Sequence, residues 1–346
     1  MTISRCGFVA LLLATTAAAP PPKDATKAEA APNPSVASGS SPVAVANGSP
    51  IVVPAAVPQT QRDLIRAQVL LDRAHFSPGV IDGKPGSNLK LALSAYQAAN
   101  SLPVDGKTSE ELIAKLVAAD SANSMQHYTV TEADAAGPFI GKLPTDYAEL
   151  AKLDSPTYAD AAEALAERFH MDETLLRALN PGVDFAKAGS EIIVAAISAE
   201  KLGAAVTKIE VDKSKNVVRA YGADDALLAV YPATVGSSER PAPDGTWAVR
   251  TVAPAPSYTF DPKRLTFGKA GLGKLTIKPG PNNPVGATWI DLTKDTYGIH
   301  GTPEPRLIGK RASHGCVRLT NWDAQQLGKS VKAGAKVIFM GRDKRA

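Results

Sequence analysis

Cysteine is nearly absent from this chain of 346 residues, which contains only Cys6 and Cys316. Cys6 lies in residues 1–19, where Arg5 precedes a short apolar run and then Thr and Ala. This layout is typical of a cleavable signal peptide, so we expect an exported mature protein with one thiol. In an oxidising compartment, one cysteine excludes an intramolecular disulfide and leaves Cys316 as a candidate nucleophile.

Long apolar runs are also missing. The run near the N-terminus is far below the ~20 residues that cross a bilayer, and no later stretch comes close, so we expect no transmembrane span. Residues 20–60 have almost no aromatic side chains and consist mainly of Ala, Pro, Ser, Gly and Val. Because such a segment buries too little apolar surface to offset its ordering entropy, we predict a disordered linker.

The charge is unevenly placed along the chain. The net charge is +4, but residues 201–346 carry +11 and the residues before them carry −7. No zinc-finger or RNA-binding pattern accompanies the basic half, so we expect no nucleic-acid partner. An extracellular substrate that bears carboxylates fits the basic half better, and we expect the protein to act in the periplasm or cell wall as a monomer.

Residues 61–118 have the apolar periodicity of three helices. Asp82-Gly83 and Asp105-Gly106 predict tight turns between them, and Ser109 is a suitable cap for the last helix. The segment around these two turns resembles the small peptidoglycan-binding domain that is appended to cell-wall enzymes.

Residues 125–197 predict a small module with the order strand, helix, helix, strand. Tyr128 to Val130 and Glu191 to Ala196 are the predicted strands, and Asp172 is the predicted cap of the second helix. With Leu-Asn-Pro after the second helix, the module resembles a LysM domain, which binds glycans that contain N-acetylglucosamine. An insertion of some two dozen residues follows the first strand, so glycan binding and a purely structural spacer both stay open.

Residues 205–341 change to short alternating runs separated by Asp, Asn and Gly turns. This pattern predicts a mainly β domain of curved antiparallel sheets. One helix is expected there, beginning at Asn321 as its cap. The whole chain is therefore expected to be multidomain, with this β domain behind a three-helix unit and a small α+β module.

Cys316 lies in Ser313-His314-Gly315-Cys316-Val317-Arg318, and His300 lies upstream in Ile299-His300-Gly301-Thr302. A thiol with an ordinary pKa of ~8.5 is only a few per cent thiolate at neutral pH, so it needs a nearby base. His314 is two positions from Cys316 in the sequence, whereas His300 can lie near Cys316 only if the fold brings the two segments together. Inert packing of the cysteine, a structural zinc site made with both histidines, and a structural ion pair for Arg318 are the alternatives.

These two blocks closely resemble the signature of the L,D-transpeptidase (YkuD) family, and the resemblance extends across roughly residues 206–340. It implies that Cys316 is the nucleophile, that His300 takes its proton, and that His314 shapes the substrate and oxyanion site. A backbone carbonyl is expected to orient His300, because the next residue is Gly301. Substrate-binding residues would be Arg318, Ser313, Gly315 and Gly301, and no metal or organic cofactor is required.

The family reaction would start on a peptidoglycan tetrapeptide. Cys316 would attack the carbonyl of the third residue, release D-alanine and hold the acyl group as a thioester. An amine of a second stem peptide would then take the acyl group and form a cross-link between two third residues. Transfer to water, transfer to a lipoprotein lysine, a thiol peptidase and an inert wall-binding scaffold are the competing functions.

Overall fold

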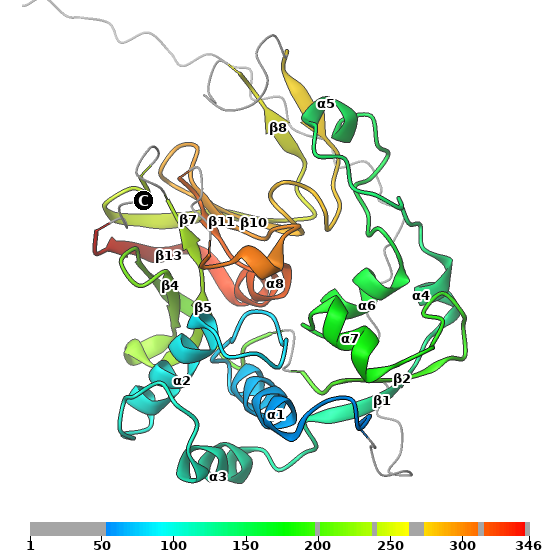
Figure 1. The fold of residues 1–346 in the computed structure, drawn as a ribbon. Helices are drawn as coiled ribbons and strands as arrows, with labels where there is room; N and C mark the ends of the chain where they lie inside the picture. Colours follow the sequence, from blue (N-terminus) through cyan, green and yellow to red (C-terminus); the bar gives the residue numbers. More distant parts are fainter. Residues whose placement is uncertain (1–52, 198–200, 237–240, 263–272, 311–314, 343–346) are drawn as a thin grey trace, which may run out of the picture. The chain divides into compact units, whose positions relative to one another are not determined.

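The computed structural model describes residues 53–197, 201–236, 241–262, 273–310 and 315–342 (Figure 1). The predicted signal peptide and most of the predicted linker lie outside the described residues. Within these ranges, no helix combines the length and apolar composition needed to span a bilayer.

Three helices form the first described unit: α1 (Gln59–Arg73), α2 (Ser87–Ala99) and α3 (Glu110–Ala119). The expected cap is present, because the Ser109 hydroxyl accepts a hydrogen bond of 3.2 Å from the Leu112 amide. A buried glutamine fixes each predicted turn. Gln68 accepts from the amide of Gly83, and Gln97 accepts from the amide of Gly106, both at 2.8 Å.

The middle module contains β1 (Met125–Thr129), α4 (Glu132–Ala136), α5 (Tyr147–Leu150), α6 (Ala161–Arg168), α7 (Glu173–Leu179) and β2 (Glu191–Ala195). The predicted order of strand, helix, helix and strand is found in β1, α6, α7 and β2, and β1 pairs with β2 in antiparallel register. The predicted insertion carries α4 and α5.

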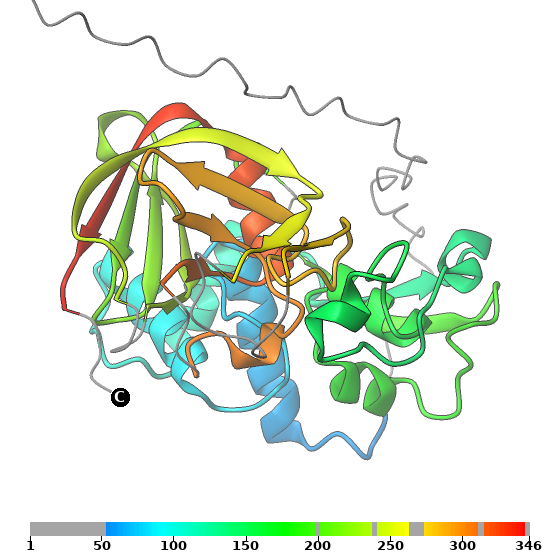
Figure 2. The same ribbon diagram turned by 90° about the horizontal axis from the view of Figure 1, so that it is seen from above.

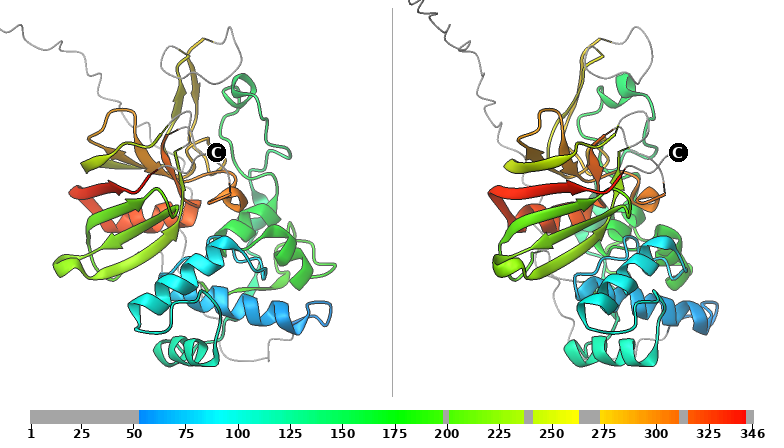
Figure 3. Two further views of the ribbon diagram at one scale, coloured as in Figure 1. Left: turned by 60° about the vertical axis from the view of Figure 1, so that its left-hand side comes forward. Right: turned by 90° about the vertical axis from the view of Figure 1, so that its left-hand side faces the viewer.

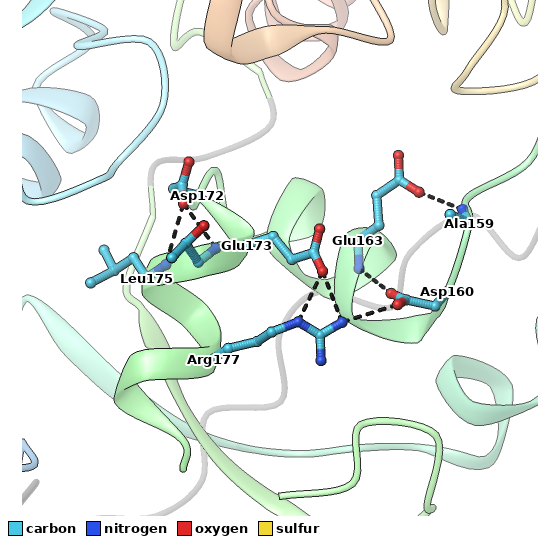
Figure 4. A network of polar contacts seen from close by, with 8 residues as sticks. Ala159, Asp160, Glu163, Asp172, Glu173, Leu175 and Arg177 are labelled. Atoms are coloured by element: carbon cyan, nitrogen blue, oxygen red, sulfur yellow. Dashed lines mark hydrogen bonds and ion pairs between the residues drawn. The ribbon is translucent and has the colours of Figure 1, made fainter. Parts of the chain in front are cut away.

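Carboxylates begin the two main helices of this module (Figure 4). Asp172 accepts from the amide of Leu175 at the start of α7, and Asp160 accepts from the amide of Glu163 in α6. Arg177 contacts Asp160 and Glu173, so it ties the start of α6 to α7 (Figure 4). The predicted cap at Asp172 is thus confirmed.

Nine of the described strands form one sheet. They are β3 (Val206–Asp212), β4 (Val217–Tyr221), β5 (Leu227–Pro232), β6 (Thr234–Val235), β7 (Gly245–Pro254), β10 (Thr288–Leu292), β11 (Gly298–His300), β12 (Val317–Arg318) and β13 (Val331–Met340). Their order is β5-β4-β3-β13-β7-β10-β11-β12-β6. Only Ala233 separates β5 from β6, so the two ends of this order are consecutive in the chain. The sheet must therefore curl until its ends approach (Figure 2).

Two further strands, β8 (Tyr258–Phe260) and β9 (Leu275–Ile277), pair with each other outside this sheet (Figure 3). Short 3-10 turns lie at Ala223–Asp225 and Pro305–Leu307. The predicted mainly β domain with one helix is confirmed.

That helix, α8 (Asn321–Ser330), begins at the residue that was predicted to be its cap, one position earlier than expected. The cap is Thr320, whose hydroxyl accepts a hydrogen bond of 3.2 Å from the Asp323 amide. The prediction of Asn321 as cap was wrong because its side chain forms long-range hydrogen bonds instead. Ala324 and Leu327 of α8 are fully buried in the core of the sheet.

Candidate active site

Strands β11 and β12 bring the two sequence blocks together. They pair in parallel, with Ile299 opposite Val317 and His300 opposite Arg318. Ile299 and Val317 face the core and are fully buried. Because side chains alternate along a strand, His300 and Arg318 lie on the other face. Cys316 lies two residues before Arg318, in the bend that leads into β12.

Cys316 is half-buried, and its thiol lies 3.7 Å from the carbonyl oxygen of Thr296. Gly315 before it has a φ of +111°, which side chains other than glycine rarely adopt. A Cβ at Gly315 would also approach the ring of Tyr297 to 3.2 Å. Glycine is therefore required for the turn that presents the thiol.

His300 is 3% exposed, and its ring stacks on Trp289 with a centroid separation of 5.4 Å. Its Nδ1 donates to the carbonyl oxygen of Gly301 at 2.7 Å, so the expected backbone partner is present. The pKa of His300 is lowered from 6.5 to about 3, chiefly by burial and then by the charge of Arg318. Hydrogen bonds to the backbone of Gly301 and Val285 act in the opposite direction.

Arg318 is half-buried beside two tyrosines that the sequence analysis did not single out. Burial raises the pKa of Tyr258 in β8, and the nearby Tyr147 raises it further, whereas the charge of Arg318 lowers it. Burial also raises the pKa of Tyr147, with Arg318 again acting against it. Both phenols therefore lie within electrostatic reach of the guanidinium.

Tyr147 belongs to α5 in the insertion of the middle module. Its ring centroid lies 5.8 Å from that of Tyr258 and 5.3 Å from that of Phe260. The length of the insertion was the one signal in the sequence that pointed to this contact. Only the fold reveals that the insertion packs on β8.

Of the other predicted site residues, Gly301 follows His300 on the β11 side and Gly315 precedes Cys316. Ser313 and His314 lie outside the described residues. The paired strands β11 and β12 therefore place His300 opposite Arg318, with Gly301 directly after β11 and Gly315 and Cys316 directly before β12.

Two parts of the chain match models of known protein families. Residues 207–339 match the model of the L,D-transpeptidase catalytic domain, YkuD, and residues 60–116 match that of a putative peptidoglycan-binding domain. A putative L,D-transpeptidase YkuD of Bacillus licheniformis is 29% identical over 51% of this chain and 92% of its own length.

Two further relatives match shorter parts of the chain. The putative L,D-transpeptidase YqjB of Bacillus subtilis is 31% identical over 34% of this chain and 61% of its own length. The probable L,D-transpeptidase ErfK/SrfK of Escherichia coli is 34% identical over 34% of this chain and 38% of its own length. Among solved structures, L,D-transpeptidase 3 from Mycobacterium tuberculosis is 17% identical and covers 44% of this chain and 76% of its own, with a TM-score of 0.33.

Proposed function

We propose, from the premise that this chain carries an L,D-transpeptidase catalytic domain of the YkuD family behind a peptidoglycan-binding domain, that it cross-links peptidoglycan through Cys316. The observation that supports this role is the pairing of β11 with β12, in which His300 lies opposite Arg318, two residues after the only cysteine of the described residues. The substrate is a wall tetrapeptide, so the protein acts outside the cytoplasm.

In the first half-reaction, the Cys316 thiol transfers its proton to the imidazole of His300 as sulfur attacks the carbonyl of the third stem residue. The amide bond to D-alanine breaks, and the imidazolium returns the proton to the leaving amine. A thioester on Cys316 and free D-alanine are the products. We assign the stabilisation of the oxyanion in this step to the amides of Gly315 and Cys316.

In the second half-reaction, an amine of another stem peptide attacks the thioester. His300 takes a proton from the amine, the carbon–sulfur bond breaks, and the thiolate recovers the proton. The thioester conserves the energy of the original amide, so no nucleotide is needed. The new amide joins two third residues.

Arg318 is the residue that we assign to a carboxylate of the stem peptide, because its planar guanidinium can donate two parallel hydrogen bonds. Tyr147 and Tyr258 are half-buried near this group, and we expect them to shield the site partly from water. Exclusion of water favours the amine in the second half-reaction, since water would hydrolyse the thioester.

The acceptor is tested by incubating the purified protein with tetrapeptide muropeptides and determining the product masses. We expect a cross-linked dimer together with released D-alanine. Tripeptide alone would identify an L,D-carboxypeptidase, and transfer only to an added lipoprotein would identify an anchoring enzyme. If the muropeptides are unchanged while the protein still binds cell walls, the wall-binding scaffold is the correct function.

The depressed pKa of His300 predicts an unusual pH profile. A histidine with the ordinary pKa of 6.5 would become protonated, and lose its function as a base, below that pH. Since burial and Arg318 lower the pKa of His300 to about 3, its neutral form persists under mild acid. The rate constant for acylation of Cys316 should therefore show no inflection between pH 5 and 7.

This profile is measured by intact mass spectrometry with a carbapenem, a β-lactam that the family resemblance predicts will acylate Cys316. Near-ultraviolet circular dichroism at each pH is the control for loss of fold. A tenfold fall in rate for each pH unit below 6.5, with the fold intact, would contradict the assigned state of His300.

A further inference from the structure

The side-chain amide of Asn321 joins three segments of the chain. It is 1% exposed at the first position of α8. Its Oδ1 accepts hydrogen bonds of 3.0 Å from the amides of Thr302 and Ala287. Its Nδ2 donates to the carbonyl oxygen of Pro281 at 3.0 Å and to both carboxylate oxygens of Glu167 at 3.0 and 3.1 Å. Each polar atom of this amide is thus hydrogen-bonded.

The two segments that bind Asn321 Oδ1 also hold the imidazole of His300. One contains Gly301, whose carbonyl oxygen accepts from Nδ1, and the other contains Val285, whose backbone forms the second hydrogen bond. A Cβ at Gly301 or Gly286 would lie 2.1 Å from Asn321 Oδ1. The backbone therefore packs closely around this oxygen. A movement of Asn321 would displace both segments that hydrogen-bond the imidazole of His300.

Glu167 reaches this network from another module. It lies in α6, 154 residues before Asn321. Its carboxylate also accepts a hydrogen bond of 2.9 Å from the hydroxyl of Tyr158. Glu167 is half-buried, and burial raises the pKa of its carboxyl group to about 7. Loss of the hydrogen bonds between Glu167 and Asn321 would destabilise the folded protein, because a buried polar atom without a partner costs free energy.

Further hydrogen bonds join the middle module to the catalytic domain near Asn321. Asn282 donates to Glu163 at 3.0 Å, and Ser155 donates to the carbonyl oxygen of Pro279 at 2.6 Å. These bonds join the middle module to the segment that leads to Val285. Together, these hydrogen bonds hold the middle module in place against the catalytic domain.

We propose that Glu167 is a positioning residue for His300: it fixes Asn321, and through Asn321 the two backbone segments that orient the imidazole toward Cys316. This inference deepens the proposed function, on which it rests. It makes the middle module a structural part of the active site, whether or not the module also binds glycan.

The test uses three full-chain variants. Glu167→Asp shortens the side chain by one methylene and withdraws the carboxylate from Asn321, and Glu167→Ala removes it. Glu167→Gln keeps an oxygen that can accept from Asn321 Nδ2. We expect the Asp and Ala variants to acylate Cys316 ~10- to 100-fold more slowly, as is typical of a catalytic group misplaced by a distant change. The Gln variant should stay within about threefold of the unmutated protein, because it restores the acceptor.

A second readout separates positioning from general stability. The imidazole ¹⁵N signals of His300 report which ring nitrogen carries the proton, and they should shift in the Asp and Ala variants but not in the Gln variant. Glu173→Ala is the matched control, since Glu173 is a carboxylate of the same module that pairs with Arg177 instead (Figure 4). It should change neither the rate nor the signals.

Unchanged His300 signals and acylation rate in a folded Glu167→Asp or Glu167→Ala protein would overturn the proposal. If the Ala variant does not fold, the milder Asp variant decides. The signals also distinguish this failure from that of the proposed function: an unmutated protein that is never acylated refutes the role of Cys316, whereas the response of His300 to Glu167 can still be measured.

Discussion

Replacing Cys316 with alanine is expected to abolish both the carbapenem adduct and the muropeptide product. The reason is that no other thiol in the described residues can form the thioester. Intact mass spectrometry after carbapenem exposure should show one added mass on the unmutated protein and none on the variant. The loss should be complete, since sulfur forms the covalent bond itself.

The matched control is Cys6→Ala in the full, unprocessed chain, which changes the other cysteine of the sequence. It should leave the adduct and the product unchanged. An adduct that persists in the Cys316→Ala protein would place the nucleophile elsewhere. An unmutated protein that forms no adduct and no product would favour the wall-binding scaffold.

Replacing His300 with alanine should slow the acylation of Cys316 by ~100-fold or more, the usual effect of losing a general base. The imidazole is buried on β11, which pairs with the strand that follows the thiol, and its low pKa keeps it neutral. The rate is measured from the growth of the adduct mass with time. The change should reduce the rate constant and leave the final stoichiometry at one adduct for each chain.

His127→Ala is the histidine control, because His127 lies in β1 of the middle module. It should acylate at the unmutated rate, and thermal unfolding of both variants shows whether the fold is retained. Equal acylation of the His300→Ala and unmutated proteins would remove His300 from the role of base. Restoration of the rate by added imidazole would support that role.

The sequence predicted those structural features that depend only on residues close together in the chain. Ser109 and Asp172 were recognised as caps because a cap depends on the residue and the next turn. The alternating runs predicted strands for the same reason. Asn321 shows the limit of such reasoning, since its residue type suits a cap but its side chain forms bonds across the fold. Tyr147 was missed because its partners lie in another domain.

The sequence by itself determined the chemistry available to this protein: a thiol in a glycine turn, an imidazole on a second strand and a guanidinium two residues from the thiol. These follow from covalent order and strand alternation. Only the tertiary structure decided the neutral state of His300, the tyrosines near Arg318 and the link from Glu167 to Asn321. Each of these features depends on burial or on contacts between residues far apart in the chain. A local sequence pattern encodes neither burial nor such contacts.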